Sequence, residues 1–490
     1  MRWTVDEVAQ VLSVAPPAAL DPLTRLAGVS IDSRTIGAGE LYVAIHGLRH
    51  DGHAFVESAL ARGALAAVVD PRRLAEYPEG IRGKLLPAED TLAALQRLAQ
   101  AVRRRWGRRL AGVAGSIGKT TTKEILAALL AARFRVLKSE GNLNNEYGVP
   151  LTLLRLEDAH ESAVIEMGMS HRGELARLAE IAEPEVGVVT RVAIEHLEFF
   201  SSVDEIALAE RELIEHLAGP RPVAVLNADD ERVARFAGVA RGEVIWFGYG
   251  SATQFRAEAI EDRGAEGTAF DFVWPAGRAR LALPLVSRHN VTNALAALAA
   301  ASIWGVGAAE AAHVFPRLAP AAMRGEVLRF DAGFTVLNDC YNSSPTALAA
   351  MIHWLAATPG YRRRILGAGE MLELGPASPE LHREAGRVAA ADGRIDWIFG
   401  VQGEAASLLR GAVEAGYPET RTRFFASSEE AAQFLADFLT PGDLLLVKGS
   451  RGVHMERIVE ALKSGQAPAA TLAEAAADAG ATGPAPKECG

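Results

Sequence analysis

The residues best suited to chemistry lie between positions 111 and 124, where the chain reads Ala-Gly-Val-Ala-Gly-Ser-Ile-Gly-Lys-Thr-Thr-Thr-Lys-Glu. Gly115 and Gly118 allow backbone N–H groups to turn towards an anion, because glycine adopts conformations that other residues avoid. Lys119 adds a positive charge at the start of a helix, where the helix dipole also favours an anion. Thr120 is placed to put its hydroxyl group on a Mg²⁺ ion. The sequence therefore predicts a cradle for nucleotide phosphates, which we call the phosphate loop.

A strand and a helix are expected on either side of the phosphate loop. Residues 110–114 are apolar enough for a short buried strand. Beyond the loop, apolar side chains recur at helical spacing: Ile125, Leu126, Leu129 and Leu130. The strict pattern G-x-x-x-x-G-K-[ST] requires glycine at position 113, where this chain has Val113. A glycine turn without a ligand is the alternative, but it leaves Gly-Lys-Thr-Thr directly after an apolar strand unexplained.

Further polar side chains follow other predicted strands of the same region. They are Asn142, Asn144, Asn145, Glu166, His196 and Glu210. The carboxyl ends of parallel strands form the edge at which open α/β sheets bind their ligands. Glutamate, histidine and the hydroxyl of the phosphate loop, completed by phosphate oxygens and water, are suitable for Mg²⁺. Taken singly, each has an ordinary alternative, because a lone histidine is often a satisfied loop residue and Glu210 could lie on a solvated helix face.

Residues 1–88 are expected to form a small α/β domain with its own polar loops. Its predicted strands are residues 29–31, 41–45 and 64–69. The cluster Asp32, Ser33 and Arg34 follows the first of them, and the glycine-containing loop 47–52 follows the second. These loops could hold a diphosphate or a sugar, although turn chemistry alone also explains such residues.

The pattern of apolar runs predicts an α/β protein of three domains. Residues 89–316 alternate strands with helices, which favours a central, P-loop-type, mostly parallel sheet flanked by helices. Residues 317–463 repeat that alternation and predict a Rossmann-like C-terminal domain. The predicted strands of the two regions are residues 135–138, 163–166, 186–190, 223–226, 335–338, 364–366, 397–399 and 444–447, with a hairpin at 271–283. Residues 464–490 are rich in Ala, Gly and Pro and are expected to be a disordered tail.

The composition limits the possible partners and compartment. The 490 residues are 49% hydrophobic and 23% charged, as is common in soluble globular proteins. A net charge of −10 argues against nucleic acid as a partner, because no basic excess exists to neutralise phosphates. Two cysteines exclude a disulfide framework, and we find neither an apolar signal sequence nor a run that could span a membrane. We therefore expect a cytoplasmic monomer without a membrane partner.

Motifs along nearly the whole chain combine into one pattern. Besides the phosphate loop, they are residues 30–34, 51–53, 142–150, 289–293, 339–345, 370–375 and 448–451. Together they resemble the Mur ligases of peptidoglycan synthesis over about residues 25–462. Residues 30–34 and 51–53 resemble that family's uridine-nucleotide domain, and Glu166 and His196 match its magnesium ligands. The phosphate loop is similar to its ATP loop, with Ala114 where threonine is common.

The resemblance implies an ATP-dependent, ADP-forming amide ligase that acts through an acyl phosphate in the synthesis of the cell wall, and hence in cell shape and division. It implies ATP and Mg²⁺ as cofactors and UDP-N-acetylmuramoyl-tripeptide and D-alanyl-D-alanine as substrates. The catalytic residues it implies are Lys119, Glu166, His196 and Glu210, and the metal ligands are Thr120, Glu166 and His196. The ATP contacts it implies are Gly115, Ser116, Ile117, Gly118, Lys119, Thr120, Thr121, Asn290, Arg324 and Asp339. The substrate contacts are Ser30, Asp32, Ser33, Arg34, Asn142, Asn144, Asn145, Tyr341, Asn342, Lys448 and Arg451.

The chain departs from the family pattern near the metal site. Glu210 stands where the family has a lysine that becomes carbamylated, so a carboxylate is present without modification. Three further departures are Arg191 and Ser344, each in place of asparagine, and Asn338 in place of aspartate. Two alternatives therefore stay open, namely another amide ligase similar to folylpolyglutamate synthase and a non-catalytic nucleotide-binding protein. The sequence leaves open whether the tripeptide ends in diaminopimelate or lysine.

Overall fold

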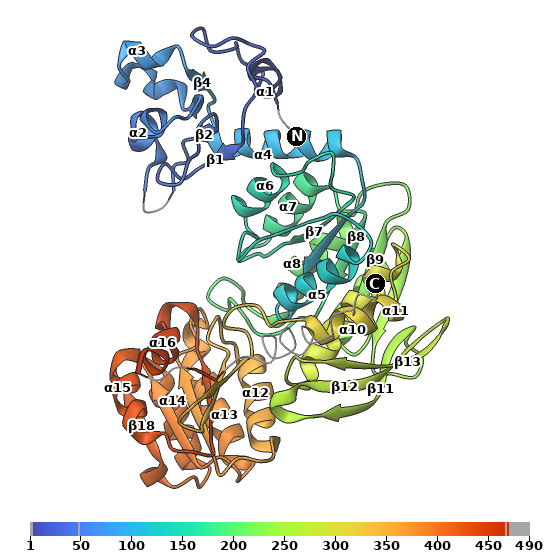
Figure 1. The fold of residues 1–490 in the computed structure, drawn as a ribbon, viewed down its shortest axis with the longest axis vertical. Coiled ribbons are helices and arrows are strands. Elements are labelled where there is room, and N and C mark those ends of the chain that lie inside the picture. Colours follow the sequence, from blue (N-terminus) through green and yellow to red (C-terminus); the bar gives the residue numbers. More distant parts are fainter. Residues whose placement is uncertain (1–2, 48–49, 466–467, 470–490) are drawn as a thin grey trace, which may run out of the picture.

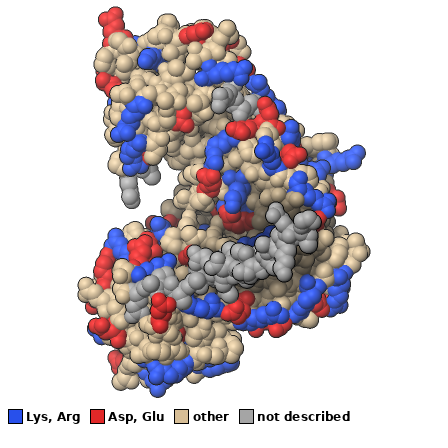
Figure 2. Space-filling view, in the orientation of Figure 1, with Lys and Arg blue, Asp and Glu red and all other residues tan. Residues whose placement is uncertain are grey.

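The computed structural model describes residues 3–47, 50–465 and 468–469, which form three α/β domains around three separate sheets. The domains follow one another along the chain and are arranged in an open, angular shape (Figure 1). Figure 2 shows the visible face hollowed between the first and third domains, with Lys and Arg side chains interspersed among Asp and Glu. No helix in the described part of the chain is both long and apolar enough to cross a membrane. The predicted fold class is thus confirmed, whereas the exact domain boundaries stay predictions.

The first domain is built on a four-stranded parallel sheet in the order β1-β2-β3-β4. The sheet buries β2 and β3 completely, and their apolar side chains reach both faces. Its strands are β1 (Val29–Ser30), β2 (Leu41–Val43), β3 (Ala66–Val69) and β4 (Leu85–Pro87), and its helices are α1 (Val5–Leu12), α2 (Val56–Ala61) and α3 (Glu79–Arg82). The long helix α4 (Thr91–Trp106) begins at the capping side chain of Asp90 and ends at the left-handed Gly107, and it leads into the central domain.

The central domain contains a nine-stranded sheet in the order β13-β12-β11-β10-β9-β8-β5-β7-β6. Strands β5 to β11 run parallel, and β12 and β13 are added antiparallel as a hairpin. The strands are β5 (Leu110–Ala114), β6 (Val136–Lys138), β7 (Ser162–Glu166), β8 (Val186–Val189), β9 (Val223–Asn227), β10 (Glu243–Gly248), β11 (Phe255–Asp262), β12 (Thr268–Trp274) and β13 (Gly277–Leu283). Because β5 lies between β7 and β8, the loops after these three strands meet at one place.

Helices cover both faces of the central sheet (Figure 1). Helix α5 (Lys119–Ala131) packs against the alanine-rich α10 (Arg288–Ser302), whose small side chains allow close approach and are buried over most of its length. The other helices are α6 (Gly148–Leu153), α7 (Glu174–Ala182), α8 (Val203–Glu215), α9 (Glu231–Ala234) and α11 (Ala308–Val314).

The third domain has a seven-stranded sheet in the order β18-β17-β16-β19-β15-β14-β20. The five strands from β18 to β15 are parallel, whereas β14 and β20 pair antiparallel at one edge. The strands are β14 (Glu326–Phe330), β15 (Thr335–Asn338), β16 (Arg363–Gly369), β17 (Trp397–Val401), β18 (Thr422–Phe425), β19 (Asp443–Lys448) and β20 (Pro468–Ala469). The helices are α12 (Pro345–Ala357), α13 (Ser378–Ala391), α14 (Ala405–Glu414), α15 (Ser428–Phe438) and α16 (Glu456–Gly465). Of the predicted disordered tail, residues 464–465 instead end α16 and residues 468–469 form β20, whereas residues 466–467 and 470–490 lie outside the described residues.

Candidate active site

The phosphate loop follows β5, and its backbone leaves no room for side chains at two glycines. Gly115 has φ +118°, and a Cβ there would lie 2.2 Å from Thr190 Oγ1. Gly118 has φ +93°, and a Cβ there would lie 2.2 Å from Asn293 Oδ1 on α10. Thr190 Oγ1 also donates to the carbonyl of Ile117 at 2.6 Å, which fixes the loop against the end of β8. The two glycines are therefore required by both conformation and space.

Lys119 occupies the first turn of α5 and has acidic neighbours. Its Nζ donates to the Gly115 carbonyl at 2.5 Å and lies 3.9 Å from Glu195 Oε1. Glu210, on α8, is 2% exposed and accepts a hydrogen bond from the Gly115 N–H at 2.7 Å. The solvated position considered for Glu210 is therefore wrong. Its carboxylate lies directly under the phosphate loop, where it braces the backbone.

Burial and the charge of Lys119 act in opposite directions on the pKa values of Glu210 and Glu195. Burial raises the pKa of Glu210 to about 7, with the charge of Lys119 acting in the opposite direction. It also raises the pKa of Glu195, again against the attraction of Lys119. Burial by itself lowers the pKa of Lys119, but Glu195, Glu210 and Glu166 outweigh this and raise it. Lys119 is thus held as a cation among three carboxyl groups.

Glu166 ends β7 beside β5 and is also buried. Its Oε1 accepts from Asn144 Nδ2 at 2.9 Å, and its backbone N–H donates to Ser139 Oγ at 3.0 Å. Its Oε2 is buried without a hydrogen bond, 3.6 Å from the fully buried Nζ of Lys123. A buried carboxylate oxygen of this kind normally has a partner, so Glu166 is well suited to a cationic ligand.

His196 lies past β8 in a left-handed conformation, with φ +52°. Its Nδ1 is 2.5 Å from Glu373 Oε2 of the third domain, and its Nε2 is 3.8 Å from Glu195 Oε2. Burial lowers the pKa of His196, but the hydrogen bond with Glu373 and the charge of Glu195 reverse this and raise it overall. Across residues 3–47, 50–465 and 468–469, no three His, Cys, Asp or Glu side chains form a ready metal site.

The predicted residues of the third domain form one cluster at the carboxyl ends of β15 and β19. Lys448 Nζ donates to Asp339 Oδ2 at 2.6 Å and to the Asn342 carbonyl at 3.0 Å. The guanidinium of Arg324 lies over the ring of Tyr341, 4.1 Å from its centre. Arg451 lies in the loop after β19, where its Nη1 is 3.2 Å from Glu456 Oε1.

Asn290 connects this cluster with the phosphate loop. Its Nδ2 donates to the Val286 carbonyl at 2.8 Å, and its Oδ1 accepts from Asn293 Nδ2 at 3.0 Å. Together with Thr121 and Arg324 it lines a small cavity between α5 and the segment that enters the third domain. Asn290 thus positions Asn293 beside Gly118 and faces the same cavity as Arg324.

The remaining predicted asparagines differ in their surroundings. Asn144 reaches Glu166, as described above, whereas Asn145 Oδ1 accepts from the Gly148 N–H at 2.9 Å and thereby orders the start of α6. Asn142 is exposed in the preceding turn. Asn144 is therefore the one whose side chain reaches Glu166, while the Asn142 carbonyl accepts from the Asn144 N–H at 2.8 Å.

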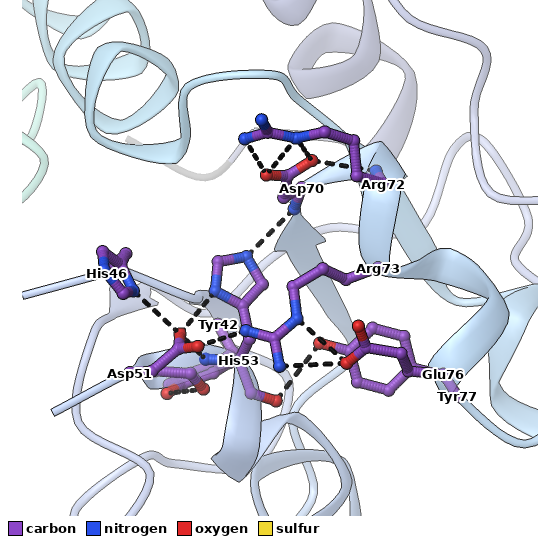
Figure 3. A network of polar contacts seen from close by, with 10 residues as sticks. Tyr42, His46, Asp51, His53, Asp70, Arg72, Arg73, Glu76 and Tyr77 are labelled. Carbon is purple, nitrogen blue, oxygen red and sulfur yellow. Dashed lines mark hydrogen bonds and ion pairs between the residues drawn. The ribbon is translucent and has the colours of Figure 1, made fainter.

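The first domain carries a second polar network at the carboxyl ends of its strands (Figure 3). His53 is buried and lies between two acidic residues, with its Nδ1 2.8 Å from Asp51 Oδ1 and its Nε2 accepting from the Asp70 N–H at 3.0 Å. Arg73 pairs with both Asp51 and Glu76. Burial alone would raise the pKa of Asp51, but hydrogen bonds from His53 and Arg73 hold it well below its usual range. The network fixes the loop 50–53 against β3.

The predicted cluster at residues 30–34 lies beside this network, after β1. Arg34 forks onto Asp32, with Nη2 2.7 Å from Oδ2 and Nε 2.9 Å from Oδ1, while 84% of its side chain is exposed. Ser30 Oγ accepts from the Asp32 N–H at 3.1 Å, and Ser33 is buried. Asp32 thus holds the guanidinium group of Arg34 in place, and that group is exposed to solvent.

Sequence reasoning missed three residues of the site. Glu195 and Lys123 contribute charges next to Lys119 and Glu166, and Glu373 reaches His196 from another domain. Lys123 lies one helical turn after Lys119, a spacing that could have indicated it. Glu195 directly precedes His196 and Glu373 lies in the motif 370–375, but neither received a role, because their contacts with Lys119 and His196 are tertiary.

Three family models match successive parts of the chain. They are described as Mur ligase family, catalytic domain (residues 25–103), Mur ligase middle domain (113–301) and Mur ligase, glutamate ligase domain (323–451). The chain therefore belongs to the Mur ligase family, and it is a ligase. A curated relative, UDP-N-acetylmuramoyl-tripeptide–D-alanyl-D-alanine ligase of Bacillus subtilis, is 34% identical over 94% of this chain and 98% of its own length.

Solved structures agree with this assignment. A crystal structure of MurF from Acinetobacter baumannii superposes with a TM-score of 0.84 at 29% identity, covering 95% of this chain and 99% of that one. MurF ligase from Thermotoga maritima in complex with ADP has a TM-score of 0.76 at 28% identity, covering 89% of this chain and 97% of that one. The likeness extends over all three domains, so the motifs used in the sequence comparison lie on the same architecture.

Proposed function

We propose that this chain joins D-alanyl-D-alanine to UDP-N-acetylmuramoyl-tripeptide with ATP as the energy source, a step of peptidoglycan synthesis. One observation of the site carries the proposal. Lys119 of the phosphate loop is the cation around which Glu166, Glu195 and Glu210 gather, and it also feels the charge of Arg324, which lies over Tyr341 of the third domain. Such a site binds a nucleotide phosphate together with a divalent cation, and it faces a second domain that can bring an acceptor.

The first half of the reaction transfers a phosphoryl group. A carboxylate oxygen of the tripeptide attacks the γ-phosphorus of ATP, the bond to the β-phosphate oxygen breaks, and ADP leaves. Lys119 and the backbone N–H groups of the phosphate loop stabilise the charge on the transferred group. Gly115 and Gly118 hold those N–H groups in place, and Glu210 braces the Gly115 amide from below. The product is an acyl phosphate.

The second half forms the amide bond. The amine of D-alanyl-D-alanine attacks the carbonyl carbon of the acyl phosphate, loses a proton, and releases phosphate. We propose that Tyr341, Asn342, Lys448 and Arg451 bind substrate at this step, as does Asn144 beside Glu166. Arg324 and Asp339 approach the nucleotide as the third domain closes, which excludes water that would otherwise hydrolyse the acyl phosphate.

The residues of the site fit Mg²⁺. Glu166 has a buried carboxylate oxygen without a hydrogen bond, and Thr120 and His196 add a hydroxyl and an imidazole. We propose that these three residues hold the ion together with nucleotide phosphate oxygens. The ion would neutralise phosphate charge when bound. We further propose that the Glu210 carboxylate takes the electrostatic place of the family's carbamylated lysine.

Phosphate release tests the function against its alternatives. The account predicts ATP-dependent phosphate release that requires both UDP-N-acetylmuramoyl-tripeptide and D-alanyl-D-alanine, with the tripeptide offered in its diaminopimelate and lysine forms. Release with a folate and glutamate in their place would favour a folylpolyglutamate-synthase-like enzyme. Binding of nucleotide without release under any of these conditions would favour a non-catalytic protein.

A further inference from the structure

Glu373 of the third domain contacts His196 of the central domain. Glu373 Oε2 lies 2.5 Å from His196 Nδ1, and the Glu198 N–H donates to the backbone carbonyl of Glu373 at 3.1 Å. The two loops are also in close contact at Gly375, where an added Cβ would lie 3.4 Å from Glu198 Cα. A side chain and a backbone group of one residue thus join the two domains at the candidate metal ligand.

The geometry leaves one imidazole nitrogen free for a ligand. Because a carboxylate oxygen accepts and cannot donate, His196 Nδ1 donates to Glu373, and Nε2 is the nitrogen that can bind a cation when the ring carries a single proton. Nε2 points towards Glu195 Oε2, 3.8 Å away, and Glu195 Oε1 in turn lies 3.9 Å from Lys119 Nζ. The free nitrogen is therefore turned to the phosphate loop.

The backbone at this contact is held in an unusual conformation on both sides. His196 has φ +52° and Glu373 has φ +62°, and they are two of nine non-glycine residues with positive φ in the described part of the chain. L-residues avoid this region unless surrounding contacts impose it. Two such residues facing each other indicate that the chain is organised to make this contact.

The loop that carries Glu373 is anchored to the ligase motifs of the third domain. The Leu372 N–H donates to Ser450 Oγ at 2.9 Å, and the Ser450 N–H donates to the Glu370 carbonyl at 3.1 Å. Ser450 belongs to the loop of Lys448, which pairs with Asp339. A movement of the third domain would therefore move Glu373 together with the proposed substrate-binding residues.

We propose that Glu373 is a positioning residue that fixes the His196 imidazole, with Nε2 directed to the nucleotide-bound divalent cation, when the third domain is docked. Carboxylates that accept from a metal-ligating histidine hold its tautomer and orientation in this way. This inference rests on the proposed function in placing the cation beside His196. It links the position of the third domain to the affinity of the central domain for the metal.

The test uses Mn²⁺ as a probe of the full-length protein with saturating ADP, measured by the electron paramagnetic resonance signal of free Mn²⁺. Glu373→Ala is expected to weaken Mn²⁺ binding about 10-fold or more. Glu373→Gln keeps an acceptor oxygen for Nδ1–H, so it should stay within about 3-fold of the parent protein, a smaller loss than removal of the partner gives. In a His196→Ala background, Glu373→Ala should have no further effect, because the residue through which it acts is gone.

Glu266→Ala is the matched control, because Glu266 pairs with Arg329 and also joins the central and third domains. It should leave Mn²⁺ binding unchanged. The proposal would be overturned if Glu373→Ala weakened Mn²⁺ binding equally with and without His196, or if Glu266→Ala weakened it to the same extent. Either result would indicate that Glu373 only contributes to the contact between the domains. The titration involves no turnover, so a failure to form the amide would contradict the proposed function without altering this result.

Discussion

At the scale of single residues, the site is a balance between one lysine and several carboxyl groups. Lys119 is surrounded by Glu166, Glu195 and Glu210, and burial raises the pKa of Glu210 to about 7. A carboxyl group with such a pKa can take up a proton when a nearby positive charge is lost. Removal of the lysine therefore need not leave buried negative charge behind.

Lys119→Ala is expected to abolish ligation and to keep the fold. The variant loses the charge that faces the transferred phosphoryl group, which should lower the rate at least about 10²-fold, as removal of one such group does in other enzymes. Phosphate release measures the rate, and thermal unfolding should show a midpoint close to that of the parent protein. A nearly normal rate would mean that the phosphate loop is misassigned.

Glu210→Gln separates charge from shape. Glutamine can still accept from the Gly115 N–H, so the phosphate loop should keep its conformation while the negative charge is lost. We expect a lower kcat and a higher Mg²⁺ requirement, and the parent enzyme should not respond to bicarbonate because no carbamate has to form. The test is the ligation rate measured as a function of Mg²⁺ concentration for the parent enzyme and the variant. The same Mg²⁺ dependence in both would refute the role given to Glu210.

The local part of the site was predictable from the sequence, and the tertiary part was not. Gly115, Gly118 and Lys119 act through neighbours in the chain, so their spacing alone indicates a phosphate loop. Glu195 acts because the loop after β8 lies beside Lys119, and Glu373 acts because that loop also meets the third domain; the sequence does not express either distance.

At the scale of elements, a buried ion pair ties two neighbouring strands of the third sheet. Asp443, at the start of β19, is fully buried, and its register partner on β16 is Arg363. Arg363 Nε donates to Asp443 Oδ1 at 2.8 Å, and the Thr440 N–H donates to Oδ2 at 2.7 Å. Burial alone would raise the pKa of Asp443, but Arg363 and Thr440 outweigh it and hold the pKa below its usual range.

Asp443→Asn should lower the free energy of unfolding at pH 7 by about 3 kcal/mol, at the low end for breaking a buried pair because Arg363 is 23% exposed. The pKa of Asp443 in the folded protein lies below its value of about 3.9 in the unfolded chain. The Asp443 charge therefore contributes fully to the free energy of unfolding above that pH, and this contribution is lost as the pH falls through the folded pKa. The free energies of unfolding of the parent protein and Asp443→Asn, measured with urea, should therefore differ less below about pH 4 than at neutral pH. A difference in the free energy of unfolding that stays the same at both pH values would contradict a contribution from the charge of Asp443.

The elements themselves were predictable where burial is uniform. The strands β5, β7, β8, β9, β15 and β19 are buried throughout and contain an apolar run, and the sequence indicated all of them. Strands β11 and β14 mix exposed or half-buried charged residues with apolar ones, and the sequence did not indicate them. Short apolar runs reveal buried strands, whereas a strand that carries several charged residues, such as β11 or β14, has no apolar run that would reveal it.

At the scale of the whole molecule, we assign the two nucleotide-containing ligands, ATP and UDP-N-acetylmuramoyl-tripeptide, to different domains. Arg34 lies in the first domain with its guanidinium exposed beside Asp32, whereas the phosphate loop lies in the central domain. Arg34→Ala should therefore raise the KM for UDP-N-acetylmuramoyl-tripeptide about 10-fold or more, as loss of a charged hydrogen bond does, with little change in the KM for ATP. Equal changes in both constants would contradict a separate uridine-nucleotide domain.

The central claim is that the amide forms through an acyl phosphate, and oxygen transfer tests it most directly. The tripeptide carboxylate is labelled with ¹⁸O, the reaction is run with ATP and D-alanyl-D-alanine, and the released phosphate is analysed by mass. The oxygen that attacked the γ-phosphorus leaves with the phosphate, so the account predicts one ¹⁸O atom in each phosphate from fully labelled carboxylate. Unlabelled phosphate released together with the amide product would contradict it.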